Sequence, residues 1–306
     1  MNDVSGVIAV AICDRDGLII SSEDRAEFNN ESIIGVLSAV LDSYIERIKN
    51  EFGTESSFMN ITTTGDKKFA YCSMGPNSIL TTIATLNTSD VELRVYSEHI
   101  AGKIELIIAG TDNVSLEIPE IIRTLSKVKE GKLPAGDFST KLILTGDYCV
   151  GKTSLIKRFV ENKFQESYLS TLGIELSKKT LDVGETTYVN FIIWDIAGQK
   201  TQMGPYRKRF YSGANSAFIV IDRTREGNLK SIEYWYNDIK DSININIPIV
   251  IVGNKSDLEE EIVISESEIK EIADKYGFHY ILTSARTGDN VNDAFLYIAY
   301  RFLEMV

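Results

Sequence analysis

The stretch Gly146-Asp147-Tyr148-Cys149-Val150-Gly151-Lys152-Thr153 decides the fold of the second half of this 306-residue chain. It satisfies the pattern G-x-x-x-x-G-K-[ST] and lies between an apolar run at 141–145 and a stretch with helical apolar spacing at 155–160. A loop bounded by glycines turns its amides toward phosphate oxygens, and the following helix adds its positive dipole end. In such a loop Lys152 reaches the β- and γ-phosphates, and the Thr153 hydroxyl is a ligand of Mg²⁺. We therefore expect a strand, a phosphate loop and a helix here.

Further polar segments each follow an apolar run. Trp194-Asp195-Ile196-Ala197-Gly198-Gln199 carries a carboxylate for the Mg²⁺ shell, a glycine amide that can meet a γ-phosphate, and a glutamine that can orient a water. In Asn254-Lys255-Ser256-Asp257, the Asp257 carboxylate can accept hydrogen bonds from guanine N1–H and N2–H₂, which adenine cannot donate. A backbone amide of Thr283-Ser284-Ala285-Arg286 can meet guanine O6. Thr171, in a polar loop, can supply a second hydroxyl to Mg²⁺.

The second half alternates between strand-like and helical segments. Strands are predicted at 141–145, 175–183, 187–194, 217–222, 248–253 and 280–283. The second and third form a hairpin, and helices separate the others. Ser265 and Glu268 fit a capping box at the start of one helix. The predicted class is α/β, a doubly wound, mostly parallel sheet with helices on both faces, which binds ligands at the carboxyl ends of its strands.

These motifs, in this order and at strand ends, resemble the Ras superfamily of P-loop GTPases, most closely its Rab-like members, over residues 140–306. The resemblance implies a Mg²⁺-dependent switch that binds GTP and GDP, hydrolyses GTP, and meets effector, exchange and activating proteins. It implies switch segments at 164–175 and 196–213, and it implies that Phe164 packs against the guanine. The candidate catalytic residues are Gln199 and Lys152, and the candidate metal ligands are Thr153, Thr171 and Asp195. The candidate nucleotide-binding residues are Gly146, Cys149, Val150, Gly151, Lys152, Thr153, Ser154, Phe164, Thr171, Gly198, Asn254, Lys255, Asp257, Ser284, Ala285 and Arg286.

Two loop residues depart from the family pattern. Tyr148 and Cys149 occupy positions where the family usually has small residues. A side chain as large as Tyr148 crowds the γ-phosphate or the space of an arginine finger, so we expect slow hydrolysis and an unusual activating mechanism. A non-cycling, GTP-bound scaffold is the alternative, although Gln199, Thr171 and Lys152 weigh against it. Asn254-Lys255-Ser256-Asp257 disfavours a third reading, an unrelated P-loop ATPase.

The first half reads as two strands, a helix, three strands and a helix, an α+β layer with one antiparallel sheet. The strands are expected at 4–13, 18–20, 57–63, 68–73 and 78–86, and the helices at 31–49 and 90–108. The turn Asp14-Arg15-Asp16-Gly17-Leu18-Ile19-Ile20 and the helix around Ile33-Ile34-Gly35 resemble the roadblock family; longin and profilin-like domains are near alternatives. The resemblance implies homodimerisation and regulation of the GTPase. We expect a roadblock-like domain at 1–112, a linker with a short helix at 113–139 and the GTPase domain at 140–306.

Composition excludes several other classes of protein. Hydrophobic residues make up 43% and charged residues 25% of the chain, as in ordinary globular proteins. The net charge of −12 argues against nucleic-acid binding. The apolar runs are shorter than the ~20 residues of a membrane span, and the three cysteines form no metal or disulfide pattern. The N-terminus does not resemble a signal peptide, and the ending Phe302-Leu303-Glu304-Met305-Val306 offers no cysteine for a lipid anchor. We expect a cytoplasmic protein that reaches membranes through partners.

Overall fold

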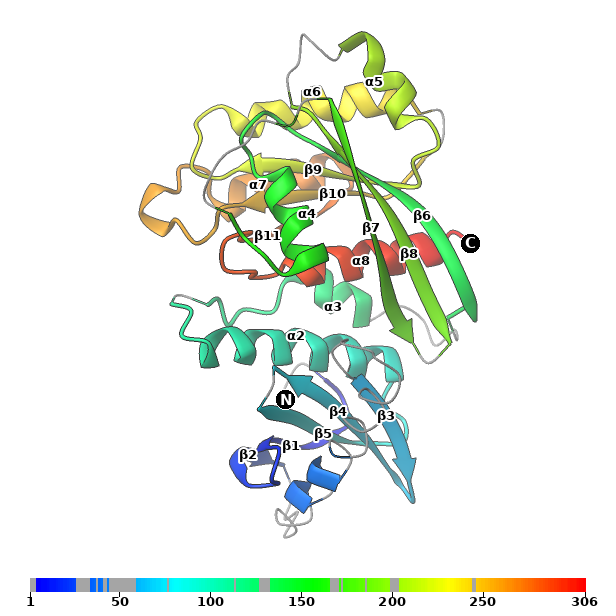
Figure 1. Ribbon diagram of the computed structural model, residues 1–306, viewed down its shortest axis with the longest axis vertical. Helices are drawn as coiled ribbons and strands as arrows, with labels where there is room; N and C mark the ends of the chain where they lie inside the picture. Colours follow the sequence, from blue (N-terminus) through cyan, green and yellow to red (C-terminus); the bar gives the residue numbers. More distant parts are fainter. Residues whose placement is uncertain are drawn as a thin grey trace. The chain divides into compact units, whose positions relative to one another are not determined.

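The computed structural model divides the chain into two compact units. It describes residues 4–25, 34–36, 38–40, 43, 59–75, 77–112, 114–126, 133–165, 171, 173–184, 186–198, 204–243 and 246–306. Unit 1 comprises Met1–Leu116 and Thr124–Glu130, and unit 2 comprises Glu117–Arg123 and Gly131–Val306 (Figure 1). None of the described helices combines the length and the apolarity that a membrane crossing requires.

Unit 1 is built on a five-stranded antiparallel sheet in the order β2-β1-β5-β4-β3. Side chains of β1 alternate between its two faces: Ala9 and Ala11 pack with Ile34, whereas Val10 and Ile12 pack with α2 residues such as Ala101. Of the predicted helix at 31–49, the structure describes 34–36, 38–40 and 43, all helical, and the other positions lie outside the described residues. The elements are β1 (Val7–Asp14), β2 (Ile19–Asp24), β3 (Met59–Thr64), β4 (Lys67–Met74), β5 (Ser78–Thr85) and α2 (Asp90–Ile108).

The two halves of the motif in unit 1 that resembles the roadblock family pack against each other. The Asp14 carboxylate accepts a hydrogen bond from the Leu18 amide at 2.7 Å and so closes the turn before β2. Gly17 in this turn has a φ of +86°. A Cβ on Gly35 would lie 2.2 Å from the Gly17 carbonyl oxygen. Glycine is therefore needed where the helix meets the turn.

Unit 2 is built on a six-stranded sheet in the order β11-β10-β9-β6-β8-β7, in which only β7 and β8 pair antiparallel. This is the predicted sheet, with one difference. Strand β6 begins at Gly136 rather than at 141, because residues 136–140 pair with 187–191 of β8. The strand thus starts inside the segment 113–139 that is predicted as a linker, whereas helix α3 (Glu120–Ser126) is the short helix expected in that segment. The strands are β6 (Gly136–Thr145), β7 (Ile174–Gly184), β8 (Thr187–Ile196), β9 (Ser216–Asp222), β10 (Ile249–Asn254) and β11 (His279–Leu282).

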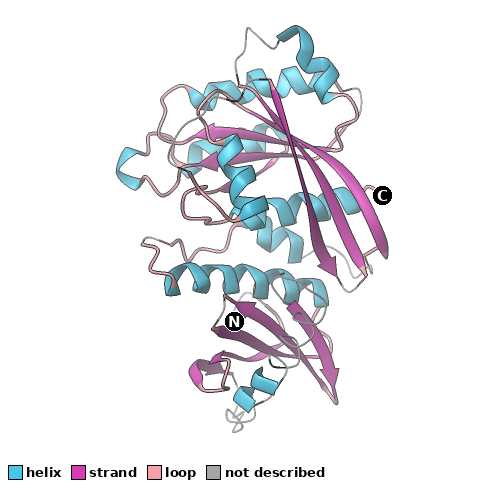
Figure 2. Ribbon diagram, in the orientation of Figure 1, coloured by secondary structure: helices cyan, strands magenta, loops and turns pink. Residues whose placement is uncertain are grey.

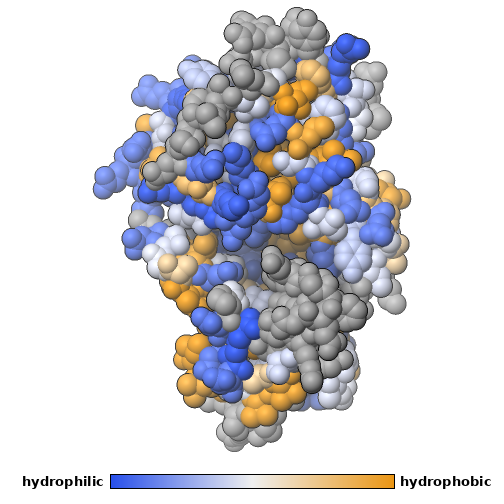
Figure 3. Space-filling model, in the orientation of Figure 1, coloured by the Kyte–Doolittle hydropathy of each residue, from blue (hydrophilic) through white to orange (hydrophobic). Residues whose placement is uncertain are grey.

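Helices cover both faces of this sheet (Figure 2). On one face the Phe159 ring of α4 stacks on the Phe295 ring of α8, and Phe218 of β9 meets Phe295 edge-on. The next residue of β9, Ile219, points to the other face and joins a cluster that contains Trp235 of α6. With both faces covered, the carboxyl ends of the parallel strands remain for a ligand. The helices are α4 (Lys152–Glu161), α5 (Gly204–Tyr211), α6 (Asn228–Lys240), η1 (Glu259–Glu261), α7 (Glu266–Tyr276) and α8 (Val291–Leu303). Figure 3 shows hydrophilic and hydrophobic side chains interspersed on the described part of the face in view.

Candidate nucleotide-binding site

A cavity of about 450 Å³ lies within unit 2, where the phosphate loop and the loops after β10 and β11 meet. Its volume suits a small organic ligand. Most of the predicted site residues line it, although they come from segments more than 130 positions apart in the chain. The lining residues are Tyr148, Cys149, Gly151, Lys152, Thr153, Ser154, Lys157, Phe164, Gln165, Thr171, Gly198, Asn254, Lys255, Asp257, Leu258, Ala285 and Arg286.

The phosphate loop depends on its two terminal glycines. Gly146 has a φ of +143°, and a Cβ there would lie 2.2 Å from the Val220 carbonyl oxygen of β9. Gly151 has a φ of +101°, and a Cβ there would lie 2.2 Å from the Asn254 amide nitrogen. Both backbone angles and both close approaches exclude a side chain. The loop thus fits between β9 and β10 only with these glycines.

Lys152 lies over the loop, with its ammonium group turned back toward the backbone. Its Nζ donates to the carbonyl oxygens of Gly146 and Asp147, each at 2.8 Å. The side chain is 6% exposed. Burial lowers its pKa to about 8, although the Asp195 and Asp147 carboxylates act in the opposite direction. A phosphate in the cavity would favour the charged form, because an opposite charge nearby raises the pKa of an amine.

Three oxygen-bearing side chains meet beside Lys152. Thr153 Oγ1 donates to Asp195 Oδ2 and lies 3.0 Å from Thr171 Oγ1. Asp195 Oδ1 is buried without a hydrogen-bond partner among the described residues, and burial raises the pKa of this carboxyl group. A buried carboxylate oxygen beside two hydroxyls fits Mg²⁺, which prefers oxygen ligands and fills its shell with phosphate and water. The described part of the chain holds no cluster of three His, Cys, Asp or Glu side chains for another metal.

The opposite end of the cavity carries the groups predicted to recognise a base. Asn254 joins the loops: its Nδ2 donates to the Val150 carbonyl at 2.9 Å, and its Oδ1 accepts from the Ala285 amide at 3.1 Å. Ser284 Oγ donates to Asp257 Oδ1 at 2.7 Å, so this carboxylate is held by one oxygen. The Phe164 ring lines the same cavity. This end thus offers the second oxygen of the Asp257 carboxylate, and the Phe164 side chain is a further part of the cavity lining.

Four predicted residues do not line the cavity but support it. Gly146 and Val150 shape the loop, Asp195 lies behind Thr153, and Ser284 lies behind Asp257. Gly198 lies against the loop, because a Cβ there would come within 2.5 Å of the Tyr148 nitrogen. Gln199, the second candidate catalytic residue, lies outside the described residues.

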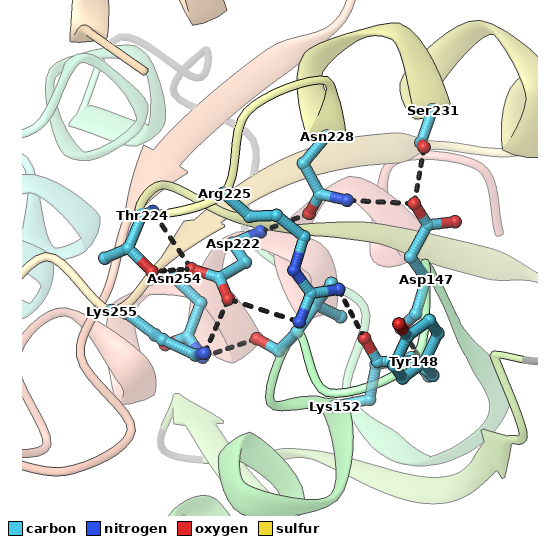
Figure 4. Close-up of polar contacts among 11 residues, drawn as sticks. Asp147, Tyr148, Lys152, Asp222, Thr224, Arg225, Asn228, Ser231, Asn254 and Lys255 are labelled. Carbon is cyan, nitrogen blue, oxygen red and sulfur yellow. Dashed lines mark hydrogen bonds and ion pairs between the residues drawn. The ribbon is translucent and has the colours of Figure 1, made fainter. Parts of the chain in front are cut away.

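The structure adds side chains that the motifs did not indicate (Figure 4). The Asp147 carboxylate accepts hydrogen bonds from three α6 side chains, Asn228, Ser231 and Trp235, and Figure 4 shows the bonds from Asn228 and Ser231. Arg225 donates from Nη1 to the Tyr148 carbonyl at 2.8 Å, and its guanidinium carbon lies 5.1 Å from the centre of the Tyr148 ring. Asp222 accepts from Lys255 Nζ at 2.5 Å. Only Asp222 had a signal in the sequence, since it ends an apolar strand as Asp195 and Asn254 do.

Comparisons with known proteins agree with this geometry. The Ras family model matches residues 141–304. Ras-related protein Rab-1 of Theileria parva is 38% identical over 164 residues, which cover 53% of this chain and 74% of that protein. Ras-related protein Rab-21 of Mus musculus is 36% identical over 169 residues, covering 55% and 74%. Ras-related protein YPT3 of Nicotiana plumbaginifolia is 35% identical over 159 residues, covering 52% and 72%. The chain therefore belongs to the Ras family, and it is a small GTPase that binds guanine nucleotide and hydrolyses GTP.

Proposed function

We propose that the cavity of unit 2 is the GTP site and that it works with Mg²⁺. One observation carries this proposal: the phosphate loop, the oxygen group of Thr153, Thr171 and Asp195, and the Asp257 carboxylate all surround one cavity. Lys152 and the loop amides bind the phosphates, and the oxygen group with its unpartnered Asp195 Oδ1 holds the metal. Mg²⁺ neutralises charge that develops on the phosphates.

Base selection follows from the other end of the cavity. Asp257 accepts two hydrogen bonds from guanine, and an amide of the loop after β11 meets O6. Exchange of bound nucleotide for GTP and for ATP tests this role: we expect GTP to be retained and ATP to be washed out. Chelation of Mg²⁺ by EDTA should speed GDP release. Equal retention of ATP would contradict the assignment of Asp257.

We further propose that the Tyr148 side chain makes GTP hydrolysis slow. Its side chain lines the cavity, is 60% exposed, and is held in place by Arg225 beside the loop. A ring there crowds the γ-phosphate or the space that a partner's arginine would use, so hydrolysis is slow and activation has to proceed by an unusual mechanism. In single-turnover assays we expect Tyr148→Gly to raise the hydrolysis rate about tenfold, which is about 1.4 kcal/mol of barrier. An unchanged rate, alone and with an activator, would contradict this role.

The same single-turnover assay tests the alternative, a non-cycling scaffold that stays bound to GTP. A chain that binds GTP and releases no phosphate over many hours would be a GTP-bound interaction protein. The arrangement of Lys152, Thr153 and Thr171 supports a hydrolysing switch instead. Gln199 is proposed to orient the attacking water, and Gln199→Leu should abolish the measured phosphate release while leaving GTP binding intact.

Unit 1 is proposed to be a roadblock-like module that forms a homodimer. The packing of the Gly17 turn against Gly35 supports the resemblance on which this rests. Four apolar side chains of this region are exposed, two at the edge strand β2 and two on the helix beside its turn, and such groups favour association: Leu18, Ile20, Val36 and Val40. Mass measurement of the full chain should give a dimer, and Val36→Glu with Val40→Glu should give a monomer. A monomeric unsubstituted chain would exclude the homodimer.

Regulation within one chain is the last part of the proposal. A tethered unit 1 would act on the switch segments at high effective concentration. A truncated chain of residues 117–306 keeps all of unit 2 and removes most of unit 1. Its rate of GTP hydrolysis should differ from that of the full chain. Equal rates would exclude this regulation. We further propose that the protein is cytoplasmic and reaches membranes through effector or regulatory partners.

A further inference from the structure

Helix α6 carries a polar stripe on a face turned into unit 2. Residues 228, 231, 235 and 238 follow one another at spacings of three and four, so they lie along one side of the helix. All but the last are largely buried: Asn228, Ser231 and Trp235. Buried polar groups are kept only where partners satisfy them. The partners of this stripe belong to two different functional segments.

The first partner is the phosphate loop. The Asp147 carboxylate accepts from Asn228 Nδ2 at 2.9 Å, from Ser231 Oγ at 2.5 Å and from Trp235 Nε1 at 3.0 Å. Asp147 lies between Gly146 and Tyr148, and a Cβ on Gly198 would touch its carbonyl group. A movement of the loop when a γ-phosphate binds would therefore pull on the Trp235 indole.

The second partner is α5, which lies within the segment 196–213 proposed as a switch. Arg207 of α5 is 2% exposed. Its Nε lies 2.7 Å from Asp238 Oδ2, and its Nη2 donates to the Tyr234 hydroxyl at 2.6 Å. Its guanidinium carbon lies 5.2 Å from the centre of the Trp235 ring. Tyr211 of α5 adds a bond to the same Asp238 oxygen at 2.9 Å.

Trp235 thus contacts both segments: its N–H donates to Asp147 of the phosphate loop, and its ring lies against the Arg207 guanidinium of α5. We propose that Arg207 is a positioning residue that couples α5 to the phosphate loop through Trp235, so that the nucleotide state of the loop sets the position of α5. A buried arginine with a planar fork and a stacked face suits this role better than lysine. The inference rests on the proposed GTP site and adds a route by which the switch is read.

The two tryptophans of the chain make the coupling measurable. In the full chain with Trp194→Phe, Trp235 is the only source of tryptophan emission. The protein is loaded with GDP or with a non-hydrolysable GTP analogue in Mg²⁺, and chromatography of the denatured complex quantifies the bound nucleotide. We expect the Trp235 emission maximum to differ between the two forms. Arg207→Lys and Arg207→Gln should each lose most of that difference while both nucleotides remain bound.

Arg209→Gln is the matched control, because Arg209 lies on α5 two residues later and is exposed. It should keep the full difference in emission. Arg207→Lys retains a charge opposite Asp238, so it keeps the protein folded even where Arg207→Gln does not. A merely structural role for Arg207 would lower the melting temperature and leave the nucleotide-dependent difference unchanged.

Each contrary outcome has a distinct meaning. Emission that is the same with both bound nucleotides, a difference that survives both Arg207 variants, or a loss that occurs equally in Arg209→Gln would overturn the coupling while the GTP site stands. Failure of the unsubstituted chain to retain either nucleotide would overturn the GTP site, and this inference with it.

Discussion

Unit 1 and unit 2 are both sheets covered by helices, yet among the described residues polar side chains gather into a site only in unit 2. Its parallel strands bring their carboxyl ends to one edge, so Asp195, Asp222 and Asn254 come from three strands and lie near one cavity. The antiparallel neighbours in unit 1 end at opposite edges, and its best-defined motif, Gly17 against Gly35, is a packing contact. Strand direction thus decides whether the side chains at the carboxyl ends of the strands meet at one edge of the sheet, where they can form a binding site.

The largest expected effect is in unit 2. Asp257→Asn replaces the carboxylate that accepts two bonds from guanine with an amide that offers one acceptor and an opposing donor. Bonds to charged groups are worth about 1.5–3 kcal/mol each, so GTP affinity should fall about 100-fold or more. Titration with a fluorescent guanine nucleotide measures the loss. Asp66→Asn, in an exposed turn of unit 1, is the matched control and should bind GTP normally. An equal loss of GTP affinity in this variant would contradict the assignment of the nucleotide site to unit 2.

An intermediate effect is expected in unit 1. Gly35→Ala places a Cβ 2.2 Å from the Gly17 carbonyl oxygen, and such overpacking costs about 2 kcal/mol. Thermal or urea unfolding should show unit 1 melting earlier, with nucleotide affinity of unit 2 unchanged. Gly102→Ala is the control, because no atom lies within 4 Å of a Cβ at this helical position. It should stabilise α2 by about 0.5–1 kcal/mol; a loss of stability there would show that the contact at Gly35 is not the cause.

The smallest effects compare a helix cap in each unit. Ser265 begins α7 with a full capping box, in which its side chain and the Glu268 side chain bond reciprocally to backbone amides. Ser89 begins α2 with one long bond of 3.4 Å from the Glu92 amide. Removal of a cap costs about 1 kcal/mol. Chemical denaturation should therefore show a larger loss for Ser265→Ala than for Ser89→Ala, and the reverse order would mean that cap geometry does not set the difference.

Much of unit 2 could be predicted from local sequence. The predicted strands, the β7–β8 hairpin and the Ser265 capping box are present. The start of β6 at Gly136 was missed, because the residues after Gly131 contain turn formers and only pairing with β8 makes them a strand. In unit 1 the order of the described elements was predicted, but strand ends shifted by a few residues, as for β2 at Ile19–Asp24, whose exposed polar residues carry no alternating pattern.

The candidate site divides in the same way. Lys152, Thr153, Asp195 and Asp257 could be named from the sequence, because each belongs to a motif whose chemistry requires that residue type at that spacing. Arg207, Arg225 and Trp235 could not, because single polar residues inside helices and loops have the same appearance whether they face solvent or a partner. The chain's own order of residues therefore determined the nucleotide chemistry. Only the packing of α6 between the phosphate loop and α5 decided which side chains hold that chemistry in place, since contacts between distant segments exist only once the sheet has formed.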